Sequence, residues 1–217
     1  MTFLTLSDTH NKHKQIPEDW LLPADGIIHA GDISSMGHLH EIENFLKWFS
    51  SLEQYKYKIF CAGNHDFGFE FKQDRVKELL EKYPNIIYLQ DTFVIIDGIK
   101  IYGSPHTPYF YNWAFNLQRG EEIKKKWDLI DYDTHILITH GPVYGILDTV
   151  PDGSSVGCVD LLNTINDRLL VLKAYICGHI HCSSGIETIN DIIYVNAAVL
   201  NEKYEVQYRP RLIEVNI

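Results

Sequence analysis

The chain has 217 residues, of which 45% are hydrophobic and 22% charged, a composition typical of a globular protein with a sizeable core. Its formal net charge of −10 argues against broad electrostatic binding of nucleic acids or anionic membranes. The start, MTFLTLSDTH, lacks a basic region and is polar by Ser7, so we expect no signal peptide. No apolar stretch approaches the ~20 residues that span a bilayer. The sequence has no C-x-x-C pair, and Cys61 and Cys177 stand in apolar runs, so we expect reduced cysteines. We therefore expect a cytoplasmic protein.

Short apolar runs that end in polar residues recur along the chain and predict strands. They are TFLTLSDTH, GIIHAGD, KIFCAGNHD, HILITHGP and AYICGHIH. Between them, residues 38–52 and 74–83 place apolar side chains on one face and are predicted helices, as are 120–130 and 159–172. Strands that alternate with helices indicate βαβ units and a mostly parallel sheet that is covered on both faces.

Antiparallel hairpins are predicted in three places. Residues 93–103 read as one hairpin, with Asp97-Gly98 as its turn. Residues 185–198, GIETINDIIYVNAA, and residues 202–217, EKYEVQYRPRLIEVNI, are predicted to form the others. The fold is therefore expected to be mixed. Because no linker, low-complexity tract or internal repeat is found, a single domain over residues 1–217 is the simplest interpretation.

Metal-binding residue types follow five of the predicted strands. They are Asp8 and His10, Asp32, Asn64 and His65, His140, and His179 and His181. In open α/β sheets ligands bind beyond the carboxyl ends of the strands, where these side chains would gather. Any one of these residues alone is usually structural. A purely structural role must explain, however, why so many groups that are costly to desolvate crowd one edge of the sheet, and a functional site explains it better.

The motifs D-x-H, G-D, G-N-H-D, a lone His and G-H-x-H, in this order, resemble those of the calcineurin-like metallophosphoesterases. The match spans residues 8 to 181, and no motif residue is missing. Flanking stretches such as GSPHTPYFYNWAFN and HGPVYGILD are similar to the smaller subgroup of metallophosphoesterase-domain-containing proteins. The resemblance implies a four-layer α/β/β/α sandwich of two mixed sheets flanked by helices, with a metal site at the C-terminal ends of the strands.

The resemblance also implies two divalent metal ions. Asp8, His10 and His181 would hold the first ion, Asn64, His140 and His179 would hold the second, and Asp32 would bridge both. Imidazole nitrogens mixed with carboxylate and amide oxygens suit Mn, Fe, Zn, Ni or Mg, so the ligands do not identify the metal. Two carboxylates against four positive charges leave the site cationic in an acidic protein, which allows it to attract a phosphate.

Two ions ~3.5–4 Å apart form a clamp for in-line displacement at phosphorus, with a bridging water that loses a proton readily. In the resembled family the residue equivalent to His65 protonates the leaving group, which is typically worth ~10²–10⁴-fold in rate. We therefore expect His65 to be the general acid and Asp66 to hold its ring in one tautomer. Gly63 is expected to let the backbone turn sharply before these residues.

The resembled subgroup suggests that the chain hydrolyses small phosphodiesters, with cyclic nucleotides among the candidates. Asn11, Lys12 and His106 are further candidates for substrate contacts. Aromatic residues of the segment 104–120 could stack on a nucleobase, although pinning down a long loop explains them better. The alternatives are a phosphomonoesterase, a nuclease, which the acidic charge and the lack of a capping domain disfavour, and a non-catalytic protein-binding scaffold. Neither a membrane partner nor strong nucleic-acid binding is expected, and the sequence leaves the oligomeric state open.

Overall fold

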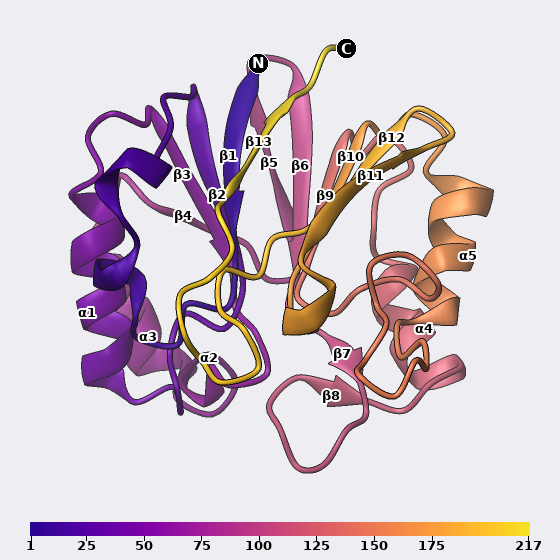
Figure 1. The fold of residues 1–217 in the computed structure, drawn as a ribbon, viewed down its shortest axis with the longest axis horizontal. Helices are drawn as coiled ribbons and strands as arrows, with labels where there is room; N and C mark the ends of the chain where they lie inside the picture. The colour runs from indigo at the N-terminus through magenta and orange to yellow at the C-terminus, as the bar shows by residue number, and fades with distance from the viewer.

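Two β-sheets packed face to face form the centre of the molecule, and helices cover both outer faces (Figure 1). The computed structural model describes all residues from 1 to 217. Helices α1 (Leu39–Ser50) and α3 (Gln73–Leu80) lie against the first sheet, and α4 (Glu121–Trp127) and α5 (Val159–Arg168) lie against the second. This arrangement confirms the predicted α/β/β/α sandwich. No helix is long and apolar enough to cross a membrane.

The first sheet is built from the N-terminal part of the chain and is completed by the last strand. Its strands are β1 (Thr2–Leu6), β2 (Gly26–Ala30), β3 (Tyr57–Cys61), β4 (Ile87–Tyr88) and β13 (Arg211–Glu214). Their order in space is β13-β1-β2-β3-β4. Strands β1 to β4 run parallel, so the carboxyl ends of the first three meet at one edge, whereas β13 pairs antiparallel with β1.

The second sheet is also mixed. Its strands are β5 (Thr92–Ile96), β6 (Ile99–Ser104), β9 (Ile136–Thr139), β10 (Ala174–Cys177), β11 (Gly185–Ile189) and β12 (Ile192–Asn196). Their order in space is β11-β12-β10-β9-β6-β5, with parallel pairing in the middle and an antiparallel strand at each edge. The two central strands β9 and β10 therefore also end at a common edge, beside the ends of β1, β2 and β3.

Two of the three predicted hairpins are confirmed. Strands β5 and β6 are joined at Asp97 and Gly98, which have φ angles of 48° and 87°. Positive φ at both turn residues is the geometry of a tight two-residue hairpin. Strands β11 and β12 are joined in the same way at Asn190 and Asp191, with φ angles of 50° and 63°.

The predicted hairpin over residues 202–217 is wrong. Its second half forms β13, which pairs with β1 at the far end of the sequence, and its first half contains no strand beyond an isolated bridge between Leu200 and Val206. The Asn201 side chain accepts hydrogen bonds from the backbone N–H groups of Lys203 and Glu205, both at 2.9 Å, and so folds this segment into a turn. The unpaired edge of β1 is covered by β13 instead.

The helices form where the apolar spacing predicts them, but they are shorter than predicted. In α1 the buried side chains of Ile42, Phe45, Leu46 and Phe49 lie on one face, and the Glu41 carboxylate accepts a hydrogen bond from the His38 N–H at 2.9 Å at the N-terminus. The remaining elements are short. They are α2 (Phe67–Phe71), the 3₁₀ turns η1 (His13–Gln15), η2 (Glu18–Trp20) and η3 (His181–Ser183), and the strands β7 (Thr107–Pro108) and β8 (Asn116–Leu117). The segment 104–120, predicted as a loop, contains β7 and β8, and residues 109–115 connect these two short strands.

Three layers of hydrophobic side chains hold the sandwich together. Successive residues of β1 illustrate the pattern, since Leu4 packs toward the helices of the first layer and Phe3 packs between the two sheets. A third cluster joins the second sheet to α4 and α5 around Trp127. Because strands are buried on both faces, they read as continuous apolar runs rather than as alternating ones. All cysteines are free.

Candidate metal centre

The predicted ligand residues come together where five strands from both sheets end. Asp8 and His10 follow β1, Asp32 follows β2, Asn64 follows β3, His140 follows β9, and His179 and His181 follow β10. Six of these side chains and that of His65 fall into three overlapping groups whose potential ligand atoms lie within 4.8 Å of one another. Asp8 and His179, which are 171 positions apart, therefore share one site, as the common edge of the strands requires.

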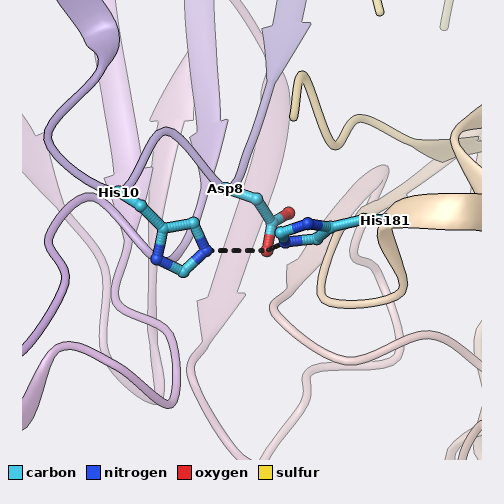
Figure 2. Close-up of side chains that lie close together, drawn as sticks. All are labelled: Asp8, His10 and His181. Atoms are coloured by element: carbon cyan, nitrogen blue, oxygen red, sulfur yellow. Dashed lines mark ion pairs between the residues drawn. The ribbon is translucent and has the colours of Figure 1, made fainter. Parts of the chain in front are cut away.

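The first cluster consists of Asp8, His10 and His181 (Figure 2). Oδ1 of Asp8 lies 3.4 Å from Nε2 of His181 and 4.0 Å from Nε2 of His10. Figure 2 shows the two imidazole rings on either side of the carboxylate, with nitrogen atoms turned toward it. One carboxylate oxygen and two imidazole nitrogens that converge in this way are a suitable donor set for one divalent ion.

The second cluster surrounds Asp32. Nε2 of His140 lies 3.2 Å from Oδ2 of Asp32 and 2.9 Å from Oδ1 of Asn64, and the His179 ring lies 5.1 Å from the His140 ring. The same Asp32 oxygen lies 3.6 Å from Nε2 of His10, which belongs to the first cluster. Asp32 is therefore placed between the two clusters, where a bridging ligand would have to lie.

Backbone carbonyls orient three of the histidines toward the centre. The contacts are from Nδ1 of His10 to Ser34 O at 3.2 Å, from Nδ1 of His140 to Ala30 O at 2.9 Å, and from Nδ1 of His181 to Asn201 O at 3.0 Å. Since a carbonyl only accepts, each Nδ1 carries a proton, and Nε2 faces the carboxylates, where it can bind either a second proton or a metal ion. Imidazoles that bind metals are held in this way by a hydrogen bond to the other ring nitrogen. Nε2 of His10 is buried without a hydrogen-bond partner, which fits a donor that serves a metal ion.

Left-handed backbone and closely packed glycines support the site. Asp8, Asp32 and His179 have φ angles of 54°, 56° and 70°, values that are rare for residues with a side chain and that cluster at functional sites. A Cβ atom on Gly178 would collide with Oδ2 of Asp8, and one on Gly63 would collide with Oδ1 of Asp32. Gly63 begins the turn expected there, since the Asp66 N–H donates to its carbonyl at 3.1 Å. Its φ is not positive, so a glycine is needed at this position to let the carboxylate approach.

The electrostatics of the site favour a cation. Burial opposes the charged form of every group here. At His181 the attraction of the Asp8 carboxylate is stronger than the effect of burial and raises the pKa to about 9. Asp32 raises the pKa of His140 to about 9 in the same way. The pKa values of Asp8 and Asp32 lie below their usual range, because the effect of burial is smaller than the attraction of these imidazoles for the charged carboxylates. Burial prevails at His10, whose pKa falls to about 4. Two protons are thus held where bound cations would take their place, so the residues fit a dinuclear metal centre.

His65 lies beside the clusters and is held by different contacts from those expected. Its Nδ1 is 2.9 Å from Ser35 O, its backbone N–H donates to Oδ1 of Asp32 at 2.8 Å, and its Nε2 lies 4.0 Å from Oδ2 of Asp32. The Trp113 ring stacks on the imidazole with centroids 4.1 Å apart. Since a carbonyl fixes Nδ1 as the protonated nitrogen, Nε2 is the ring atom free to face a substrate.

The expectation that Asp66 orients His65 is wrong. The buried Asp66 carboxylate accepts hydrogen bonds from the N–H groups of Ile33, Ser34 and Gly63 at 3.2, 3.0 and 2.8 Å, and from the Ser34 hydroxyl at 2.5 Å. Asp66 therefore faces the backbone of the segment after β2. It ties two ligand-bearing segments together.

The three further candidates for substrate contacts are engaged elsewhere. The Asn11 side chain donates to Oε1 of Glu41 at 2.6 Å, and the Lys12 ammonium group donates to the Tyr204 carbonyl. His106 is buried, with Nε2 3.1 Å from Oδ2 of Asp91. None of the three lines the cavity over the metal clusters, although Lys12 contacts Tyr204, which does. Their contact with a substrate stays a prediction.

A cavity of about 320 Å³ opens over the clusters. Besides the ligands and His65, it is lined by Phe110, Trp113, Val150, Pro151, Ile180, Cys182, Glu202 and Tyr204. The Tyr204 ring lies 5.0 Å from the His10 ring and 5.4 Å from the His181 ring. Sequence reasoning missed Glu202 and Tyr204 because their segment was assigned to a strand. No local pattern marks them.

Comparison with known proteins agrees with this geometry. The family model for calcineurin-like phosphoesterases matches residues 1–183. The chain belongs to the calcineurin-like phosphoesterase family. The human metallophosphoesterase domain-containing protein 1 is 39% identical over 98% of this chain and 70% of its own length. In Caenorhabditis elegans, UPF0046 protein T07D4.2 is 32% identical over 99% of this chain and 60% of its own length.

Solved structures show the same fold at lower identity. The protein TT1561 of Thermus thermophilus superposes on this phosphoesterase with a TM-score of 0.62 and 14% identity, covering 90% of this chain and 88% of that one. The family has a dinuclear centre of divalent metals, and this chain brings together the groups to hold one. It is a metal-dependent phosphoester hydrolase by family, and the resemblance seen in its motifs is confirmed.

Proposed function

We propose that this phosphoesterase hydrolyses small phosphodiesters and prefers them to phosphomonoesters. The observation that carries the proposal is the charge of the cavity over the metal clusters. No lysine or arginine lines this cavity, and Glu202 adds an acidic group at its wall. A phosphodiester carries one negative charge, whereas a phosphomonoester carries close to two at neutral pH. The two ions would attract either ester, but no cationic side chain adds to them and Glu202 opposes a second negative charge, so the site suits the diester better.

The protein residues divide the remaining work. Two bound divalent ions would polarise the phosphate and activate a water molecule. Asp8, His10 and His181 would hold one ion, Asn64, His140 and His179 the other, and Asp32 both. His65 in its imidazolium form, with Nδ1–H donating to the Ser35 carbonyl, would give its Nε2 proton to the oxygen of the leaving group and remain as the neutral ring. The leaving alcohol would then depart neutral rather than as an alkoxide.

The test compares two chromogenic substrates with the same leaving group. Protein stripped with a chelator would be reloaded with single metals and metal pairs, then assayed on bis(4-nitrophenyl) phosphate and 4-nitrophenyl phosphate. We expect hydrolysis only after metal is restored, and a higher kcat/KM for the diester. A higher kcat/KM for the monoester would overturn the preference. Silence toward both substrates with every metal would favour the scaffold alternative. Small cyclic nucleotides would be screened next.

Glu202 offers a direct check of the charge argument. Glu202→Lys should raise kcat/KM for the monoester relative to the diester, because it replaces a negative charge at the cavity wall by a positive one. Glu187→Lys is the matched control, since Glu187 is exposed on β11 and is absent from the cavity wall. Equal effects of both variants would show that only the net charge of the protein matters.

A further inference from the structure

A second cavity of about 190 Å³ adjoins the cavity over the metal clusters. The two share Phe110, Val150, His179 and Ile180 as common walls. His179 is one of the metal-site histidines, so a phosphate held at the clusters would lie next to the entrance of this second cavity. We call it the side slot.

The walls of the side slot are mostly apolar. Beyond the shared residues it is lined by Pro108, Tyr109, Arg119, Gly141, Pro142, Val156 and Gly157. Its only lysine or arginine is Arg119, whose guanidinium group donates to the carbonyls of Val156 and Gly157 at 2.5 and 2.7 Å. Two of its N–H donors are therefore already bound to the protein backbone. A slot of proline and aromatic side chains suits a flat apolar group rather than a second charge.

The slot is preformed by the same contacts. Asp148 is buried, and its Oδ2 accepts the N–H groups of Gly145 and Gly157, both at 2.9 Å. Together with the two bonds from Arg119, this fixes the segment that carries Val156. A binding site that is held in place before the ligand arrives costs less ordering when the ligand binds.

The two cavities also differ in which part of a substrate they can receive. His65, the proposed proton donor to the leaving group, lines the cavity over the clusters and does not border the side slot. The leaving group must lie near His65, so the slot beyond His179 is open to the ester group that stays on the phosphate.

We propose that the side slot binds the retained ester group of the diester and selects an aromatic ring at this position. The proposal rests on the proposed diesterase activity and adds the substrate class, a diester with one aryl or similarly flat group. The continuity of the two cavities and the apolar, preformed walls carry it. Val156 is a specificity-determining residue of this site, because it lines the slot and binds Arg119 through its backbone carbonyl.

The test uses two diesters that release the same chromophore, phenyl 4-nitrophenyl phosphate and methyl 4-nitrophenyl phosphate. The metal-loaded wild type should prefer the phenyl ester by ~10-fold or more in kcat/KM, mainly through KM, as expected for an apolar group entering a fitted pocket. Val156→Phe places a ring of the protein in the slot and should reduce this ratio to below about threefold. Val171→Phe is the control, since Val171 is exposed, lies just after α5 and is absent from the slot. It should keep the wild-type ratio.

A ratio that is the same in Val156→Phe and wild type would overturn the proposal, as would the absence of any preference in wild type. If Val156→Phe does not fold, Val156→Leu fills less of the slot and should give an intermediate ratio. Binding separates this proposal from the diesterase activity. Calorimetric titration with phenyl phosphate and methyl phosphate should show ~10-fold tighter binding of the phenyl compound, lost in Val156→Phe, even if neither diester is hydrolysed. Equal affinities would overturn the slot alone.

Discussion

Removing the buried Asp66 carboxylate should destabilise the protein strongly without touching a metal-ligand side chain. Asp66→Ala leaves the N–H groups of Ile33, Ser34 and Gly63 without their acceptor. Burial and the nearby Asp32 charge raise the pKa of Asp66 to about 7, so this carboxyl is only partly charged at neutral pH. A buried donor left without a partner costs ~1–3 kcal/mol. Three donors would give a large sum, but water can enter the space that is left. We therefore expect the free energy of unfolding to fall by about 4 kcal/mol, a large share of the ~5–15 kcal/mol that is typical of a folded protein.

Urea unfolding followed by far-UV circular dichroism would measure this loss in chelator-treated protein, so that metal binding does not contribute. With a slope of ~2 kcal/mol per molar urea, the midpoint should fall by about 2 M. Asp66→Asn keeps one acceptor oxygen and should lose about half as much. Asp167→Ala, which removes an exposed carboxylate from α5, is the control and should stay within about 0.5 kcal/mol of wild type. A loss below about 1 kcal/mol for Asp66→Ala would refute the reasoning.

Three further predictions concern histidines and their neighbours. His65→Ala should bind both ions yet lose ~10²–10⁴-fold in kcat. Asp32→Asn should instead lose bound metal, measured by elemental analysis. Equal metal loss in both variants would mean that His65 is wrongly assigned. Trp113→Ala should lower kcat roughly tenfold by releasing the stacked His65 ring, and Trp113→Phe should restore most of it; unchanged kcat in Trp113→Ala would speak against this role. Burial lowers the pKa of His13 from 6.5 to about 4, so the unfolded chain takes up the proton and stability should fall as the pH drops below 6.5. Between pH 7 and pH 5 the free energy of unfolding of His13→Leu should fall by about 2 kcal/mol less than that of wild type. Urea unfolding would measure this difference, and equal losses in both proteins would contradict it.

Local sequence patterns predicted much of the fold. Continuous apolar runs predicted the buried strands, and apolar spacing predicted α1 and α3, because a side chain's face depends only on its position within one element. The turn at Asp97-Gly98 was likewise predictable, since its two residues tolerate positive φ. The hairpin predicted after Glu202 failed for the opposite reason. Partner choice for β13 depends on the free edge of β1, some two hundred residues away, and no local pattern records it.

The sequence by itself determined which residue types stand at the strand ends, and in which order, and so pointed to a metal site and a family. Only the tertiary structure decided how they are held. The Ser35 carbonyl, not Asp66, orients His65, and the ring of Tyr204 faces two metal-site histidines. The side slot beyond His179 likewise joins segments that no motif connects. Motifs are local because one short segment must place each ligand, whereas orientation and cavity shape arise from packing between segments far apart in the chain.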